Sequence, residues 1–364
     1  MNALSAIADE NEIPKFLYTA SFVRCNMRRV LIFVLLILTI GAVEAETPPT
    51  LSPAVKAFVT IDAPLFALTH VRVIDGNGIP AREDQTIIVS GGKIQALGDA
   101  VTTPVPAGAK VIEMRDYTII PGLVGMHDHI FYPAGPAHYN TLAFSAPRLY
   151  LACGVTTIRT TGSLEPFTEL NLKKAIDQGR VPGPKIHVTS PYLEGPGAFT
   201  LQMHELTGPE DARKMVQYWA EQGIDNFKAY TNITREELSA AIEEVHKRGL
   251  KITGHLCSIG FREAAELGID NLEHGLMVNT EFVPGKKLDT CPSSREVREM
   301  LIKLDISGVQ VQETIRDLVA HKVAVTSTLP VFEISIPGRP PLQQRVLEVM
   351  APAMRIAYLT QRAR

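Results

Sequence analysis

Two histidines separated by one residue, His127 and His129, follow a β-branched run and a Pro-Gly turn in the segment IIPGLVGMHDHIF over 119–131. Side chains two apart on a strand point to the same face, so these imidazoles converge on one point. Neutral imidazole nitrogen is a common ligand of divalent transition metals. The pair alone is weak evidence, because a bare His-x-His is more often coincidence than a metal site unless further ligands accompany it.

Further polar residues stand where later strands are expected to end. Lys228 and Tyr230 close the fourth predicted strand, His255 the fifth and His274 the sixth. In a parallel α/β barrel the carboxyl ends of the strands share one rim, where active sites lie. Either histidine alone would be interpreted as a hydrogen-bonded core residue, but four histidines and a lysine on one rim are improbable as packing. A lysine buried there needs a partner, or it can react with carbon dioxide to give a carbamate that bridges two metals.

A strand-helix alternation after Pro121 positions these side chains. Strands are predicted at 123–129, 155–160, 185–189, 226–230, 251–255, 271–274 and 323–329, and helices at 170–178, 209–221, 234–248, 260–267, 311–321 and 342–359. This repeating order predicts a parallel sheet, and so many units favour a closed barrel. The expected fold class is therefore α/β, a (β/α)8-type TIM barrel over 119–364 that lacks its eighth strand.

Short β patterns broken by Gly turns occupy residues 66–120, ahead of the predicted barrel. They predict a small, incomplete antiparallel β-sandwich domain over 46–118, in which nothing looks catalytic. The stretch 47–56 is rich in Thr, Pro and Ser, which indicates a linker.

The first 45 residues indicate export. Met27, Arg28 and Arg29 precede the apolar run 30–40 and the small residues that end at Ala45, a pattern typical of a secretory signal peptide. The run is shorter than the roughly 20 residues that span a bilayer, so no permanent membrane anchor is expected after cleavage. Acidic residues before the basic pair favour Met27 as the true initiator. The expected location is secreted or periplasmic.

Composition excludes some classes of function. The net charge is -3, and no cluster of lysine and arginine suggests a nucleic-acid groove. Cleavage after Ala45 would leave Cys153, Cys257 and Cys291, an odd number that implies no disulfide framework. Cys257 is expected to be a small buried apolar residue.

The segments PGLVGMHDH, GVTTIRTTG, NFKAY, RGLKITGH and GIDNLEHG together resemble the amidohydrolase superfamily, specifically its imidazolonepropionase-like and Xaa-Pro dipeptidase-like group. The resemblance implies one divalent metal on His127 and His129, a second on His255 and His274, and a carboxylated Lys228 that bridges both; the metals are usually zinc. It implies hydrolysis of a C–N bond in a small amide, dipeptide or cyclic amide by a metal-bridging hydroxide. Lys228 favours a dipeptidase, because the imidazolone-ring enzymes use one metal and need no carbamate.

One part of the family pattern is missing. The family supplies an aspartate at the end of strand eight, and no matching segment follows Leu329; Asp305 and Asp317 fall in turn or helical stretches. General acid-base catalysis contributes about 10²- to 10⁴-fold, so binding should be better preserved than turnover. A C-terminally truncated chain is therefore expected, and the alternative function is a non-catalytic or defective chain that retains a metal site.

The remaining candidates carry weaker expectations. The Tyr230 hydroxyl could steady an oxyanion, with a packing role equally favoured. His204, in the long loop 191–208, could contact substrate, although a surface role is favoured. Asp128 is expected to support the site or to face solvent rather than to bind metal. Three histidines in predicted helical stretches are expected to be structural: His138, His246 and His321. The expected partner is a small amide or dipeptide substrate, with a homo-oligomer left open.

Overall fold

The computed structural model describes residues 49–364 except 136–137, 334–335, 337, 351 and 364. The predicted signal peptide over 1–45 lies outside the described residues. Within the described part of the chain, no helix is both long enough and apolar enough to cross a bilayer.

The N-terminal part of the described chain forms one mixed sheet. Its elements are α2 (Pro53–Lys56), β1 (Leu65–Val73), β2 (Arg82–Ser90), β3 (Lys93–Asp99), β4 (Lys110–Glu113) and β5 (Thr118–Ile119). The strand order is β3-β2-β1-β4, and β5 also pairs with β1. The prediction of a purely antiparallel sheet is wrong, because β4 and β5 both pair parallel to β1. The stretch predicted as linker ends in the single turn α2, which the Ser52 hydroxyl caps by accepting from the Val55 N–H.

The rest of the chain alternates strands and helices, as predicted. Its strands are β6 (Leu123–Asp128), β7 (Phe131–Gly135), β8 (His138–Thr141), β9 (Val155–Thr160), β10 (Lys185–His187), β11 (Thr189–Leu193), β12 (Asn226–Ala229), β13 (Lys251–Gly254), β14 (Asn271–Glu273) and β15 (Ala324–Thr326). Two parallel sheets result, in the orders β10-β9-β6 and β11-β12-β13-β14-β15. All seven predicted strands have a counterpart, and the third is divided between the two sheets at Val188. Among the described residues, no strand pairing joins β15 to β6.

The helices follow from local sequence signals. They are α3 (Ser145–Ala152), α4 (Pro166–Asp177), α5 (Pro209–Glu221), α6 (Arg235–Lys247), α7 (Phe261–Leu267), the 3-10 turn η1 (Gly275–Val278), α8 (Ser294–Lys303), α9 (Val309–Ala320), α10 (Leu329–Glu333), α11 (Gln344–Val349) and α12 (Pro352–Arg362). Thr234 and Glu237 form a capping box that starts α6. The single helix predicted over 342–359 is wrong: it is two helices, and the second begins at Pro352, which lacks the N–H that would continue a helix.

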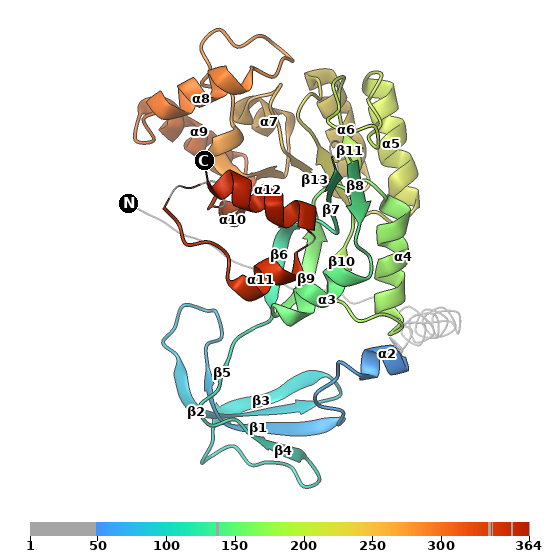
Figure 1. The fold of residues 1–364 in the computed structure, drawn as a ribbon, viewed down its shortest axis with the longest axis vertical. Coiled ribbons are helices and arrows are strands. Elements are labelled where there is room, and N and C mark those ends of the chain that lie inside the picture. The colour runs from blue at the N-terminus through green and yellow to red at the C-terminus, as the bar shows by residue number, and fades with distance from the viewer. Residues whose placement is uncertain (1–48, 136–137, 334–335, 337, 351, 364) are drawn as a thin grey trace, which may run out of the picture. The chain divides into compact units, whose positions relative to one another are not determined.

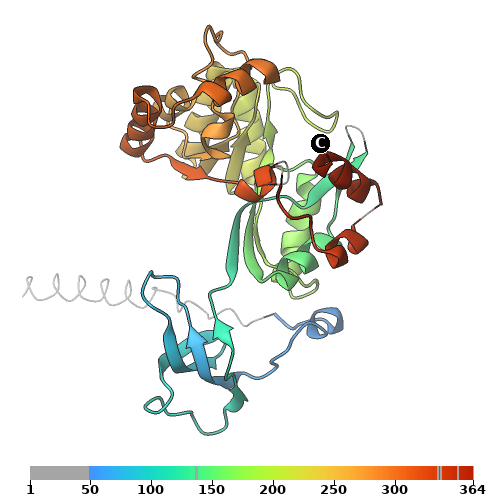
Figure 2. The ribbon, with the colours of Figure 1, turned by 60° about the vertical axis from the view of Figure 1, so that its left-hand side comes forward.

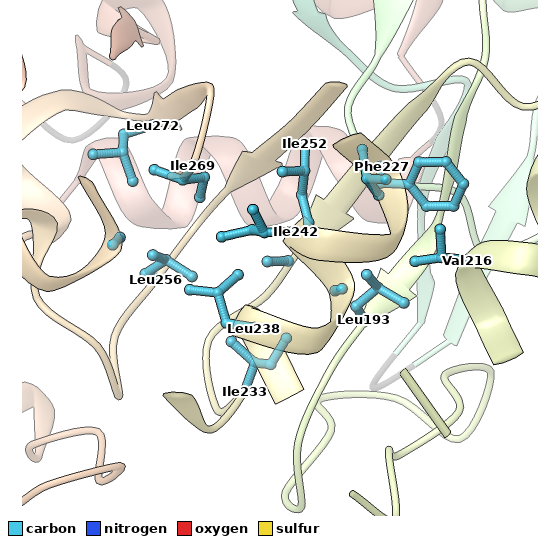
Figure 3. Close-up of a cluster of buried hydrophobic side chains, with 14 of the residues drawn as sticks. Leu193, Val216, Phe227, Ile233, Leu238, Ile242, Ile252, Leu256, Ile269 and Leu272 are labelled. Carbon is cyan, nitrogen blue, oxygen red and sulfur yellow. The ribbon is translucent and has the colours of Figure 1, made fainter. Parts of the chain in front are cut away.

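Strands β12, β13 and β14 of the larger parallel sheet are largely buried, whereas the edge strand β15 is mostly exposed. Helices α5 and α6 lie side by side, and α4, α5 and α6 pack against β10, β11 and β13 (Figure 1, Figure 2). Figure 3 shows Phe227, Ile252 and Leu272 of successive strands beside Val216 and Leu238 of the covering helices. The regular alternation of strands with helices allowed the sequence to locate these strands, since segments such as Asn226–Ala229 and Asn271–Glu273 are not continuous apolar runs.

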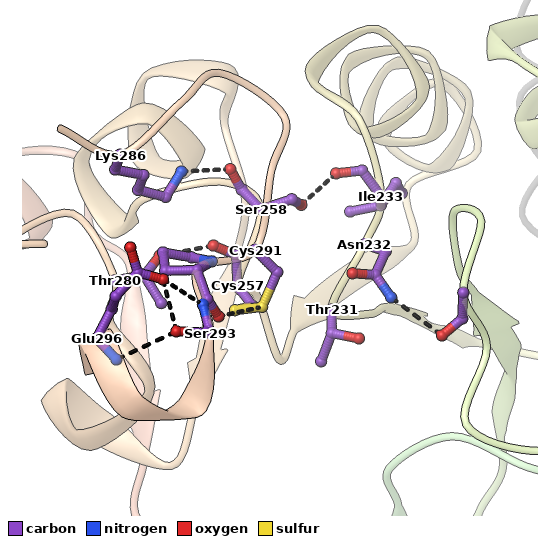
Figure 4. The surroundings of a disulfide bond; sticks show 12 residues. Thr231, Asn232, Ile233, Cys257, Ser258, Thr280, Lys286, Cys291, Ser293 and Glu296 are labelled. Atoms are coloured by element: carbon purple, nitrogen blue, oxygen red, sulfur yellow. Dashed lines mark hydrogen bonds between the residues drawn. A yellow bond between two sulfur atoms is a disulfide. The ribbon is translucent and has the colours of Figure 1, made fainter. Parts of the chain in front are cut away.

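A disulfide joins Cys257 and Cys291, so two expectations from the cysteines are wrong (Figure 4). The bond links the loop after β13 to the segment before α8, across 34 residues. The odd number of cysteines after Ala45 was misleading, because one of the three, the exposed Cys153, is unpaired and the other two form the disulfide. Cys257 is half-buried, and its carbonyl accepts from the Thr280 hydroxyl at 2.6 Å.

Candidate metal centre

His127 and His129 lie where β6 ends, as predicted, with their ring centroids 5.4 Å apart. The His127 Nδ1 atom lies 2.7 Å from Oε2 of Glu273. When Nδ1 carries the proton and donates it to this carboxylate, Nε2 keeps a free lone pair. His129 is held differently: its Nδ1 atom is buried and has no hydrogen-bond partner.

Glu273, at the end of β14, is the centre of the site and was missed as a site residue. Its side chain is fully buried. Besides His127, its carboxylate accepts from the Arg159 guanidinium at 2.9 Å and from the Thr253 hydroxyl at 2.5 Å. The available signal was an acidic residue directly before His274 in a strand expected to be buried, since a buried carboxylate requires partners.

Lys228 lies on β12 with 1% of its surface exposed. Its Nζ atom is 3.9 Å from Oε1 of Glu273 and has no hydrogen-bond partner. Burial lowers the pKa of Lys228 to about 8, and the Arg159 charge acts in the same direction. Burial alone would raise the pKa of Glu273, but the Lys228 charge and the His127 hydrogen bond outweigh it and lower that pKa to about 2.

His255 and His274 complete the histidine cluster. Their ring centroids are 4.4 Å apart, and those of His274 and His127 are 4.5 Å apart. His274 has a left-handed backbone with φ of 65°, a conformation in which histidine is enriched among non-glycine residues. Pairing with β15 fixes this conformation, because the His274 N–H donates to the Thr326 carbonyl at 2.8 Å. The hydroxyl of Thr328 lies 2.7 Å from Nδ1 of His274.

Burial keeps these imidazoles neutral. It lowers the pKa of His129 and His274 to about 3 and that of His255 to about 2, with neighbouring positive charge adding to the effect. The pKa of His127 is lowered as well, chiefly by burial, although Glu273 opposes the shift. Neutral imidazoles are the form that binds a transition metal.

The residue types suit a divalent metal, because imidazole nitrogen is a common ligand of such ions. Two rings on one tetrahedral ion, with Zn–N bonds of about 2.1 Å, have centroids about 5 Å apart, which the observed centroid distances bracket. Lys228 Nζ and His129 Nδ1 are buried polar atoms without hydrogen-bond partners, as expected of groups that bind a ligand. As placed, no three His, Cys, Asp or Glu side chains of the described residues form a group that could hold a metal ion.

Two candidates of lower rank can also be placed. The Tyr230 ring contacts that of His255 at 5.0 Å, and burial raises the pKa of its hydroxyl, so the group stays a hydrogen-bond donor. His204 is half exposed, and its Nε2 atom lies 2.8 Å from the Asp211 carboxylate. That geometry agrees with a surface role.

Of the remaining residues of lower rank, Asp128, His246 and His321 lie outside the network of hydrogen bonds and ring contacts around Glu273 and the four clustered histidines. Asp128 is half-buried, and burial raises the pKa of its carboxyl. The helical assignment of His138 is wrong, because this residue begins β8. His246 lies in α6 and contacts Asp270, and His321 ends α9.

Comparisons with solved structures show which proteins this chain resembles in fold. No protein-family model and no curated protein matches the chain. A solved structure from Bifidobacterium longum, described as a candidate prolidase, is 28% identical with a TM-score of 0.51. The match covers 58% of this chain and 54% of that one, so this chain spans about half the length of that protein.

Two further solved structures are similar in fold. An Xaa-Pro dipeptidase with bound methionine in its active site is 20% identical with a TM-score of 0.52, and the match covers 72% of this chain and 79% of that one. A bottromycin amidohydrolase is 19% identical with a TM-score of 0.56, over 86% of this chain and 64% of that one.

Proposed function

We propose that this chain, which has an amidohydrolase-superfamily fold, hydrolyses a C–N bond of a small amide, most favourably a dipeptide, with the help of divalent metal. The observation that carries the proposal is the half-buried cluster of four neutral imidazoles beside the buried Lys228, whose Nζ atom has no hydrogen-bond partner. Such a concentration of costly polar groups at the ends of parallel strands is typical of an active site rather than of packing.

In this proposal His127 and His129 hold one metal, His255 and His274 a second, and Lys228 bridges them as a carbamate. Zinc suits this set, because it accepts imidazole nitrogen and oxygen ligands. Carbamate formation joins the neutral Lys228 amine to the carbon of carbon dioxide and releases one proton from Nζ, and the lack of a hydrogen-bond partner at Nζ supports it. When bound, the metals lower the pKa of a water and polarise the substrate carbonyl.

The chain's own residues perform the other tasks. Glu273 orients His127 by accepting a hydrogen bond from its Nδ1–H group. This leaves the Nε2 lone pair of His127 free to bind a metal. The Tyr230 hydroxyl, kept protonated, donates a hydrogen bond to the oxygen on which negative charge develops. Glu273 also offsets the charge of the Arg159 guanidinium, whose Nη2 atom lies 2.9 Å from its carboxylate.

We further propose that the two parallel sheets are parts of one barrel of the TIM type. Strands β10 and β11 are separated only by Val188 and pair in different sheets. An isolated parallel bridge between Ser163 and Pro191 also connects the segment after β9 to β11. Both observations support a continuous succession of strands from β6 to β15.

Location is a separate proposal. The basic pair and apolar run before Ala45 support export to the periplasm or medium. Cell fractionation with detection of the mature N-terminus tests it, and full-length chain confined to the cytosol would refute it.

Metal analysis and turnover together test the function. The purified chain is expected to contain one or two equivalents of zinc by elemental analysis and to cleave members of a dipeptide panel. His255→Ala should lower the metal content, whereas His204→Ala, which alters a half-exposed histidine outside the cluster, should not. Folded protein that binds no divalent metal would refute the site. Metal binding without any turnover would instead favour a non-catalytic metal-binding chain.

A further inference from the structure

The histidine cluster belongs to a closed circuit of aromatic ring contacts. The path leaves His129 through Phe131, Tyr139, Phe199 and Tyr230 and returns to the histidines at His255. Contacts among the four histidines close the circuit. Successive centroids are between 4.4 and 5.7 Å apart all the way round. We call Phe131, Tyr139, Phe199 and Tyr230 the aromatic wall.

The aromatic wall has a buried back and an accessible front. Phe131 is buried, and Tyr192, also buried, packs behind Tyr230 with centroids 4.6 Å apart. Phe199 is 38% exposed, and Tyr139 and Tyr230 are half-buried. Large aromatic surface left open beside a polar centre is the usual composition of a small-molecule site.

The segment that carries Phe199 is held in place by hydrogen bonds. The Glu205 carboxylate accepts from the N–H groups of Gly197 and Ala198, each at 2.8 Å. The Gln202 side chain accepts from the Tyr139 N–H and donates to the Tyr139 carbonyl, both at 3.2 Å. Because these bonds hold the backbone around Phe199 and Tyr139 before a ligand arrives, binding loses little backbone conformational entropy.

The chemistry of the wall favours an uncharged apolar ligand. Two of its four rings are phenylalanines, which offer no hydrogen-bonding group, and Leu164 and Met203 belong to the same packed cluster. The observed ring contacts are tilted or edge-to-face, the arrangements that aromatic groups prefer when they pack. An aromatic side chain of a ligand could extend this pattern.

We propose that the aromatic wall binds the substrate side chain next to the scissile bond, and that it selects small amides or dipeptides with an aromatic or large apolar group there. This inference rests on the proposed function. The histidines at both ends of the aromatic wall set the orientation of the substrate. Its apolar group lies against Phe199 and Tyr139, and its scissile C–N bond faces the imidazoles.

Two matched substrate series test the selection. In one the acyl residue is alanine, leucine, phenylalanine or lysine, and in the other the amine residue is varied in the same way. The wild-type chain should prefer phenylalanine in one series. Phe199→Ala should lower kcat/KM for that substrate about tenfold, mainly through KM, and change kcat/KM for the alanine substrate by less than about twofold.

Two variants serve as controls. Phe199→Leu keeps an apolar side chain and should retain part of the preference. Phe167→Ala removes a phenylalanine of α4 that packs on Trp219, and it should leave the preference unchanged.

Binding provides a readout that does not depend on turnover. The dissociation constants of N-acetyl-L-phenylalanine and N-acetyl-L-alanine are measured by calorimetry for the wild type and Phe199→Ala. An aromatic preference that Phe199→Ala abolishes supports the wall, even if no substrate is cleaved and the proposed function fails. Turnover without aromatic preference, or a preference for lysine in either series, refutes the wall and leaves the proposed function standing.

Discussion

Replacing Glu169 by glutamine should make the stability of this protein less dependent on pH. Glu169 lies on α4, fully buried, and neither carboxyl oxygen has a hydrogen-bond partner of normal geometry. Burial raises the pKa of this carboxyl from 4.5 to about 8, although the hydroxyls of Ser163 and Thr160 offset part of the shift. The folded state therefore holds a proton that the unfolded chain loses at lower pH.

The sign and size follow from linkage. Between pH 4.5 and about 8 the unfolded state binds fewer protons than the folded state, so the free energy of unfolding falls as pH rises. Below this window both states hold the proton, so the penalty for ionising the buried carboxyl is absent. The slope is about 1.4 kcal/mol per pH unit, which gives a loss of about 5 kcal/mol at most across the window. That loss is a large fraction of the roughly 5–15 kcal/mol by which domains are stable.

Urea unfolding at pH 5, 6, 7 and 8 measures the effect, with fluorescence of the single, buried tryptophan, Trp219, as the probe. Glu169→Gln should be no more stable than wild type at pH 5, since its amide gains unpaired donors, and more stable at pH 8. Glu221→Gln, on the exposed end of α5, is the matched control and should retain the wild-type slope. Equal slopes for wild type and Glu169→Gln would refute the argument that a buried, protonated Glu169 is responsible.

Three further predictions concern the candidate site and its support. Glu273→Gln should lower the free energy of unfolding by about 3–5 kcal/mol in urea titrations, because Lys228 and Arg159 lose their buried counter-charge; an unchanged midpoint would contradict the central role of this carboxylate. Cys291→Ser should lower the free energy of unfolding by about 4 kcal/mol, because it opens a disulfide-closed loop of 34 residues and so raises the entropy of the unfolded chain. Cys153→Ser should change the free energy of unfolding little in the same urea titration. Equal effects of the two substitutions would show that the disulfide does not form. Tyr230→Phe should lower kcat by about 10²-fold and leave KM nearly unchanged if turnover is found, and an unaltered kcat would assign the hydroxyl to packing alone.

Much of the α/β region could be predicted from sequence because strands and helices alternate regularly in it and several helices start with clear signals. The strand 155–160 and the helix 209–221 have the predicted bounds, the second because Pro209 and two acidic residues mark its first turn. The hairpin of β7 and β8 was missed, because Pro133 and Gly135 interrupt any alternating pattern.

The residues that gather at the candidate site could be predicted from sequence, but their hydrogen-bonding partners could not. Spacing along strands located the histidines and Lys228, since this information is local. Glu273 bonds to a histidine 146 residues away, and Cys257 to a cysteine 34 residues away. Such partners depend on which strands become neighbours, which periodicity within one strand does not encode.

Glu273 also connects the two parallel sheets mechanically. It lies on β14 of one sheet, and its carboxylate binds His127 of β6 and Arg159 of β9 in the other. Among the described residues, β15 does not pair with β6, and the buried carboxylate of Glu273 instead links the two sheets by hydrogen bonds. Separation of the sheets breaks these bonds, so the centre would lose its geometry while each sheet keeps its own hydrogen bonds. Inactivation by heat or denaturant should therefore precede loss of secondary structure.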